Sequence, residues 1–377
     1  MNIEELIQQG ENSAVEFKTA DVRPESLAKE LVAFANNLGG RVLVGVDDAG
    51  CVVGSERLGF EEWVMNIARN NVVPAITAQV NEHCIANKIV HEIVVPKGLH
   101  KPYQTLDGKY LLRVGSTNRQ ATKEELSRLF RQAGLVHFDI APLPSLKEQD
   151  LNQTTLERYW DTYYSINWAR LAASERTRVL INSDILSPDC EVTVGGALLF
   201  ANNPQKALPH ASVVFAVFSG GDKTSDLVDK KEITGAINEQ VDNALGLVNL
   251  YLKRSSRVEG AVRVEDVLIP EKVLREALVN ALVHRDYSML NQKSSVYIFD
   301  DRVEITNPGG LPNTLTVEKL RYGHSAPRNM FLLKFMDNYR YIDGLGRGIP
   351  TMVAAMGSRI KFEEVGAAFR VTISLRS

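Results

Sequence analysis

Cysteine is scarce in this chain of 377 residues, and the three cysteines that it has stand alone. Cys51, Cys84 and Cys190 form no Cys-x-x-Cys pair, and their number is odd. This pattern argues against a disulfide framework and against a structural zinc site. Isolated thiols are typical of the reducing cytosol, so we expect a cytoplasmic protein.

Long hydrophobic runs and a strong net charge are also lacking. The N-terminus carries acids without the apolar core of a signal peptide, and the apolar stretch 194–201 is too short to cross a bilayer. We therefore expect no membrane partner. The formal net charge is only −3, so a nucleic-acid surface must be a local patch. A Gly-x-x-x-x-Gly-Lys-Ser/Thr loop is missing as well, which speaks against helicase activity.

The length predicts two domains, because a single hydrophobic core rarely grows past about 250–300 residues. Prolines among polar residues mark a boundary, so we expect a first domain at 1–132, a linker at 133–150 and a second domain at 151–377. Helical and strand-like segments occur in both parts, which predicts an α/β protein.

Hydrophobic periodicity and turn residues predict individual elements in each domain. In the first domain these are a helix at 25–38, strands at 41–46, 89–95 and 110–114, and a helix from 122 with a Thr122–Glu125 capping box. In the second domain they are a helical stretch at 151–186, strands at 192–200, 212–218, 294–299, 303–306 and 369–375, and helices at 235–252, 271–284 and after 343–348.

Three motifs of the second domain together predict a ligand site. Glu276, Asn280 and His284 are spaced four apart on the expected helix, so they share one face. A Gly-rich turn at 307–312 follows a strand, and a glycine run at 343–348 opens a helix. The N–H groups at a helix N-terminus favour phosphate.

In this order, the strings at 275–287, 307–309 and 343–348 resemble the GHKL ATPases, whose C-terminal fold is a Bergerat-type α/β sandwich. They look closest to bacterial RecG-like transcriptional regulators. The resemblance implies binding of ATP with Mg²⁺, where Glu276 would orient the attacking water and Asn280 would bind the metal. The other implied nucleotide-binding residues are His284, Asn307, Gly309, Arg328, Gly344, Gly346, Arg347 and Gly348.

For two of these residues, the sequence leaves the role in nucleotide binding open. Asn307 stands where the GHKL family has an Asp that accepts from the adenine amino group, so the carboxylate charge is missing here. His284 either faces the nucleotide or forms a structural hydrogen bond to the backbone.

The strings at 11–18, 31–40 and 44–50 resemble the Schlafen/AlbA domain, an α+β domain that binds nucleic acid. Residues 97–131 contain eight basic and three acidic residues, which predicts a phosphate-binding patch. The candidate contacts are Lys18, Lys101, Arg113, Arg119, Lys123 and Arg128. The alternative is a nuclease, because the ribonucleolytic Schlafens have carboxylates that match Glu11, Glu16 and Asp48. Glu11 and Glu16 would then hold Mg²⁺ or Mn²⁺.

We therefore expect an ATP-binding, nucleic-acid-binding regulatory protein. Nucleotide binding would order a lid near 325–329, change domain packing or dimerisation, and so gate the N-terminal domain. A homodimer is an expectation from the family alone. Two alternatives stay open: a metal-dependent endoribonuclease of the Schlafen type, and a non-catalytic DNA- or partner-binding module with a degenerate nucleotide pocket.

Overall fold

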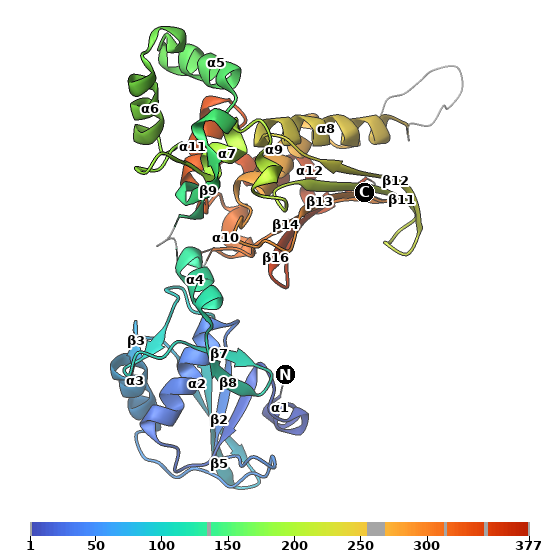
Figure 1. The fold of residues 1–377 in the computed structure, drawn as a ribbon. Coiled ribbons are helices and arrows are strands. Elements are labelled where there is room, and N and C mark those ends of the chain that lie inside the picture. The colour runs from blue at the N-terminus through green and yellow to red at the C-terminus, as the bar shows by residue number, and fades with distance from the viewer. Residues whose placement is uncertain (1, 134–136, 255–267, 313–314, 343–345, 376–377) are drawn as a thin grey trace, which may run out of the picture. The chain divides into compact units, whose positions relative to one another are not determined.

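The structure, a computed structural model, describes residues 2–133, 137–254, 268–312, 315–342 and 346–375. The chain divides into two compact units, residues 1–136 and residues 137–377 (Figure 1). Each unit combines helices with a sheet, so the predicted α/β class is confirmed.

The N-terminal unit is built on a four-stranded sheet in the order β1-β2-β5-β4. β1 and β2 are parallel, and the other neighbours are antiparallel. Val42 and Val44 of β2 pack toward α2 and α3, whereas Leu43 packs toward α1 on the opposite face. The bounds are α1 Ile3–Gln9, β1 Val15–Lys18, α2 Pro24–Asn36, β2 Gly40–Val44, α3 Phe60–Asn70, β4 Gln79–Ile85 and β5 Lys88–Val95.

Two small strand pairs and a final helix complete this unit. The bounds are β3 Val72–Val73, β6 Gln104–Thr105, β7 Leu111–Val114, β8 Thr117–Gln120 and α4 Lys123–Gln132. β3 pairs with β6, and β7 forms a hairpin with β8. The predicted capping box at the start of α4 is confirmed, because the Thr122 N–H donates to Glu125 Oε2 and the Glu125 N–H donates to Thr122 Oγ1.

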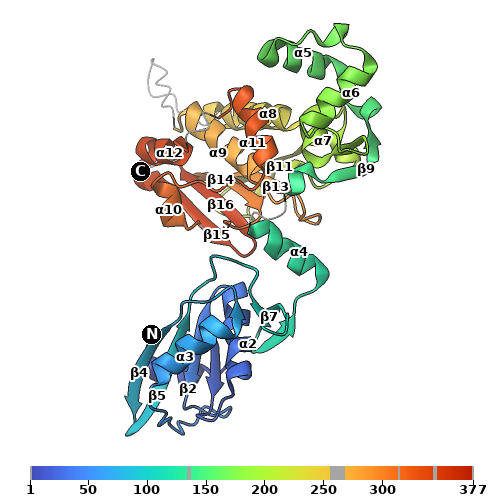
Figure 2. The same ribbon diagram turned by 90° about the vertical axis from the view of Figure 1, so that its left-hand side faces the viewer.

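The C-terminal unit is built on a six-stranded sheet in the order β12-β11-β13-β14-β16-β15. Helices α8, α9 and α12 cover one face of this sheet (Figure 2). The bounds are β11 Val213–Ser219, β12 Asp226–Ile233, α8 Ile237–Arg254, α9 Glu271–Val283, β13 Ser294–Ile298, β14 Arg302–Pro308, α12 Gly348–Met356, β15 Ile360–Val365 and β16 Ala368–Ser374.

A second group of elements packs around this layer. Tyr159 of α5 stacks on Phe335 of α11 at a ring distance of 5.0 Å, which joins the predicted helical segment to the core. None of the described helices has the length and apolar character of a membrane span. The bounds are β9 Pro142–Lys147, α5 Gln153–Tyr164, α6 Ala173–Asn182, β10 Glu191–Thr193, α7 Val194–Phe200, α10 Val317–Arg321 and α11 Met330–Asn338.

The prediction of a strand at 192–200 is wrong for most of this segment. Only β10 is extended, and the apolar run that follows is the helix α7. Thr193 caps this helix by accepting from the Gly196 N–H at 3.0 Å. Every residue of α7 is buried, so the run has no polar side from which a period could be read.

Most of the segment expected as a linker, 133–150, belongs to the C-terminal unit. β9 pairs with β10, and Leu146 lies in the core of this unit. Asp139 is fully buried, and its Oδ2 accepts from the Phe331 and Leu332 N–H groups at the start of α11. The two prolines of this segment, Pro142 and Pro144, therefore lie in the strand β9 and not in a linker.

Candidate functional site

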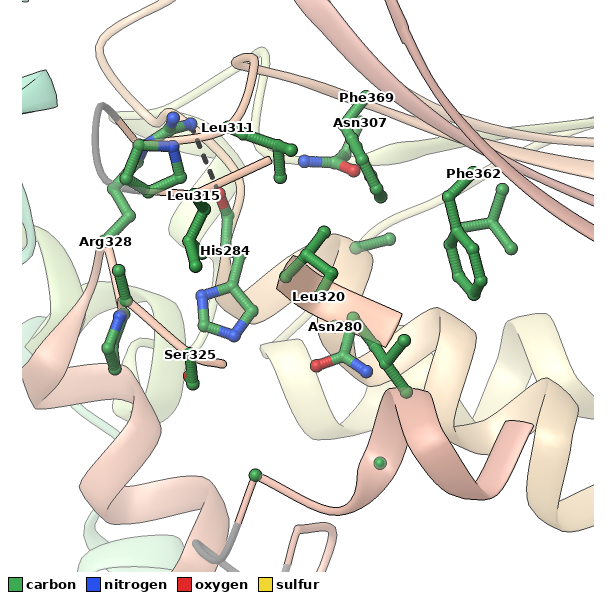
Figure 3. Close-up of a pocket in the computed structure, with 18 of the residues that line it drawn as sticks. Asn280, His284, Asn307, Leu311, Leu315, Leu320, Ser325, Arg328, Phe362 and Phe369 are labelled. Atoms are coloured by element: carbon green, nitrogen blue, oxygen red, sulfur yellow. Dashed lines mark hydrogen bonds between the residues drawn. The ribbon is translucent and has the colours of Figure 1, made fainter. Parts of the chain in front are cut away.

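A cavity of about 310 Å³ opens in the C-terminal unit beside α9, the strands β14, β15 and β16, and the start of α12 (Figure 3). Most of the predicted nucleotide-binding residues line it, although they come from segments as far apart in the chain as Glu276 and Gly348. These are Glu276, Asn280, His284, Asn307, Gly309, Arg328, Gly346 and Gly348. The cavity has the size and the mixture of apolar walls and few polar groups that are typical of a small-ligand site.

The polar face of α9 forms one side of the cavity. Asn280 Nδ2 donates to Glu276 Oε1 at 2.8 Å, so the amide orients the carboxylate. His284 follows the end of the helix, and burial together with the nearby Arg328 lowers its pKa to about 4. Its imidazole is therefore neutral at physiological pH.

The start of α12 lies against this face. A Cβ added to Gly348 would come within 1.6 Å of Glu276 Oε1, so any other residue there would displace the carboxylate from its present position. Gly346 has a φ of +68°, a conformation that favours glycine. Arg347 is exposed and is not among the lining residues, and Gly344 lies outside the described residues.

The turn after β14 is fixed by Arg328. Gly309 has a φ of +103°, and a Cβ there would lie 1.8 Å from Arg328 Nη1. The guanidinium donates to the carbonyl oxygens of His284 and Gly310. Asn329 Nδ2 donates to the Val283 and Arg285 oxygens, so this end of the expected lid is anchored to α9.

Apolar side chains of the strands form the remaining wall, and the sequence motifs did not identify them. Asn307 lies directly opposite Phe369 in the β14–β16 register. The Phe362 and Phe369 rings are 6.4 Å apart and nearly parallel. The alternation of side chains along a strand predicts that these residues share one face of the sheet. It does not tell whether that face lines a pocket or packs in the hydrophobic core.

The predicted nuclease carboxylates of the N-terminal unit have separate environments. Glu16 is buried and pairs with Lys18 and with Arg113, whose Nη2 lies 2.6 Å from Glu16 Oε2. Glu11 Oε1 accepts from the Phe17 N–H at 2.9 Å, whereas Asp48 is exposed on a turn. Among the described residues no three such side chains form a metal-binding group, so the expected carboxylate cluster is wrong.

A buried ion-pair network explains this arrangement. Arg113 and Lys18 both reach Glu30 of α2, each at 3.5 Å. Burial and the negative charge of Glu16 raise the pKa of Glu30. Burial lowers the pKa of Lys18, but the hydrogen bond to Glu16 and the surrounding carboxylates outweigh it, and the pKa is raised.

Two of the predicted phosphate contacts are wrong because their side chains are interior. Only 1% of the Arg113 side chain is exposed, and it donates to the backbone oxygens of Asn12 and Val15. Lys101 is buried and donates to the Asn37 carbonyl oxygen. Three other candidates lie on β8 and α4: Arg119 is exposed and pairs with Glu125, Lys123 is exposed, and Arg128 is half-buried.

The comparisons with known proteins agree with the two halves of this description. Residues 11–122 match the family model "Schlafen, AlbA_2", and residues 291–373 match "Putative ATP-dependent DNA helicase recG C-terminal". The resemblances to the Schlafen/AlbA domain and to RecG-like proteins are thereby confirmed. The matches point to a nucleic-acid-related protein with an ATPase-like C-terminal domain. Glu276 and Asn280 precede the second matched range, and the fold is what brings them to it.

Two solved structures were also found to be similar. A crystal structure of the DIP2311 protein from Corynebacterium diphtheriae is 22% identical with a TM-score of 0.48, over 96% of this chain and 75% of that one. A solution structure of the N-terminal domain of a RecG-related protein from Nitrosomonas europaea is 24% identical with a TM-score of 0.24, over 32% and 91%. No curated protein sequence matches.

Proposed function

We propose that the C-terminal unit binds ATP with Mg²⁺, and that nucleotide occupancy regulates nucleic-acid binding by the N-terminal unit. One observation carries the proposal: a single cavity gathers the polar face of α9, the turn after β14 and the glycines that open α12. These are the elements expected to contact the metal, the base and the phosphates.

The residues present fit such a ligand. The Asn280 amide oxygen is a hard donor of the kind that Mg²⁺ accepts, and its Nδ2 is already engaged by Glu276. An added Cβ would lie 3.0 Å from the Gly323 carbonyl oxygen at Gly346 and 1.6 Å from Glu276 Oε1 at Gly348, so the two glycines let the start of α12 lie close to these neighbours. With nucleotide bound, Mg²⁺ would neutralise phosphate charge, and Glu276 is the carboxylate available to orient a water molecule.

For nucleic acid, the proposal rests on the exposed basic side chains of β8 and α4. Arg119, Lys123 and Arg128 lie within ten residues of one another, and the first two reach solvent. Such a surface binds phosphates with little sequence preference and with a strong dependence on salt. Regulation by nucleotide would require that ATP favours one state of the chain over another.

Thermal unfolding with and without ATP and Mg²⁺ tests the nucleotide site. A ligand at 100 times its dissociation constant adds about 2.7 kcal/mol to the free energy of unfolding. We expect a rise in Tm for the wild type and for Asn243→Ala, an exposed control on α8, but not for Asn280→Ala.

An unchanged Tm in the presence of ATP would support the alternative of a degenerate nucleotide pocket. If millimolar ATP leaves the Tm of the wild type unchanged, the C-terminal unit is a non-catalytic module with a degenerate pocket. Turnover is then a separate question, which Glu276→Gln addresses by comparing phosphate release with retained ATP binding.

A further inference from the structure

The side chain of Asn307 is a polar group in an otherwise apolar part of the cavity. The residue lies near the end of β14 and is only 5% exposed. Within the described parts of the chain, no hydrogen bond to its amide is found, although the amide lines the cavity (Figure 3). An amide that faces the cavity and is not paired within the protein can pair with a ligand, and a ligand that covers the amide without pairing to it loses affinity.

The neighbours of this amide favour a flat ligand. Phe369 is its partner across the strands, Phe362 follows on the next strand, and the two rings are inclined by only 22°. Val371 continues the same apolar face. A planar heterocycle can pack on this face and present one polar edge to Asn307.

A carboxamide can match two different edges, because it offers both an acceptor oxygen and donor N–H groups. A 6-aminopurine presents an amino donor beside the acceptor N1. A 6-oxopurine presents an oxo acceptor beside the N1–H donor. Rotation of the amide by half a turn exchanges its oxygen and nitrogen, so one side chain can pair with either edge.

Nothing else on this wall distinguishes the two orientations of the amide. Among the described lining residues, the ionisable side chains are Glu276 of α9, His284 directly after α9, and His324 and Arg328 between α10 and α11. The strands contribute Asn307, Phe362, Phe369 and Val371, of which only Asn307 is polar.

We infer that the cavity accepts both 6-amino- and 6-oxopurine nucleotides, with Asn307 pairing to either base edge in one of two amide orientations. This inference rests on the proposed nucleotide site. It extends the class of ligand from adenine nucleotides to purine nucleotides in general.

Three triphosphates that differ only at this edge test the inference on the unaltered protein: ATP, inosine triphosphate and purine riboside triphosphate, which has no 6-substituent. We expect ATP and inosine triphosphate to bind the wild type within about threefold of each other by calorimetry with Mg²⁺. Purine riboside triphosphate lacks one hydrogen bond and should bind about tenfold more weakly.

A variant removes the edge contact while keeping the branched shape of the side chain. In Asn307→Leu, the advantage of ATP and inosine triphosphate over purine riboside triphosphate should be lost, and all three ligands should bind more weakly than they bind the wild type. Thr306→Val changes the neighbouring residue on the opposite face of β14 and should leave the wild-type order intact.

The outcomes separate the two proposals. If ATP binds more than about thirtyfold better than inosine triphosphate, the amide is held in one orientation and the inference is wrong. If the three ligands bind the wild type equally, the edge is not recognised and the inference is also wrong, while nucleotide binding stands. If none of them binds, the proposed nucleotide site itself is wrong.

Discussion

Arg113 and Arg119 belong to the same hairpin but have opposite environments. Arg113 is buried between Glu16 and Glu30, whereas 44% of the Arg119 side chain is exposed beside Glu125. A buried charge that loses its partner is costly, whereas an exposed pair contributes about 0–1 kcal/mol.

We predict that Arg113→Met lowers the free energy of unfolding by about 3–5 kcal/mol, because it removes the more deeply buried of the two cations, Arg113 and Lys18, that pair with the buried carboxylates of Glu16 and Glu30. The matched control Arg119→Met should change it by less than about 1 kcal/mol. Urea denaturation of both variants checks this. Equal losses would mean that the buried network does not stabilise the N-terminal unit.

At the same scale, His284 makes stability depend on pH. Its pKa is about 4 in the folded chain and about 6.5 when unfolded, so the unfolded state binds the proton more readily between these values. We predict that His284 lowers the free energy of unfolding by up to about 3 kcal/mol as pH falls from 6.5 to 4.

The comparison of wild type with His284→Gln isolates this contribution, since other groups titrate in both proteins. The difference in stability between the two should change by that amount across the window, in favour of the variant at low pH. A difference that is the same at pH 7 and pH 4.5 would show that the imidazole titrates normally.

At the scale of single elements, α11 depends on a carboxylate from outside the helix. Asp139 Oδ2 accepts from the Phe331 N–H at 2.8 Å, which gives the first turn a partner that its own residues do not supply. We predict that Asp139→Ala costs about 1–2 kcal/mol, whereas Asp139→Asn, which keeps an acceptor oxygen, costs less. Chemical denaturation measures both, and equal costs would contradict the capping role.

The contact between α12 and α9 brings Gly348 against Glu276, a residue of the cavity. We predict that Gly348→Ala displaces the Glu276 carboxylate and reduces the rise in Tm that ATP and Mg²⁺ produce, with little change in the Tm of the free protein. Gly246→Ala on α8 is the control, because a Cβ there meets nothing within 4 Å. An unchanged nucleotide response in Gly348→Ala would exclude Glu276 from the site.

At the scale of the whole molecule, the chain has a net charge of only −3. The proposed nucleic-acid binding therefore requires a local basic surface, and we propose β8 and α4 for it. We predict that Lys123→Gln combined with Arg128→Gln weakens binding to single-stranded RNA or DNA and reduces the salt slope by roughly 1.4–1.8.

Fluorescence anisotropy at several salt concentrations measures that slope, with and without ATP and Mg²⁺. Regulation requires that nucleotide shifts the wild-type affinity. An affinity that ATP leaves unchanged would make the two units independent binders, and a salt slope that the double variant leaves unchanged would move the surface away from α4.

The sequence by itself determined what depends on local pattern. The period of four in α9, the glycines before α12, the Thr122–Glu125 capping box and the hairpin of β13 and β14 all follow from residues near one another in the chain, and they were predicted. The order of motifs indicated both families, because each motif is a short string with its own backbone and chemical requirement.

Tertiary structure decided what depends on burial and on contacts between distant segments. The basic pattern at 97–131 could not reveal that Arg113 and Lys101 are interior, because their partners Glu16, Glu30 and Asn37 lie more than 60 residues away. The apolar run of α7 could not be distinguished from a strand for a related reason: burial on every side removes the polar face from which a period is read. The cavity wall of Phe362 and Phe369 likewise exists only because β15 and β16 pair beside β14 and bring these rings to Asn307.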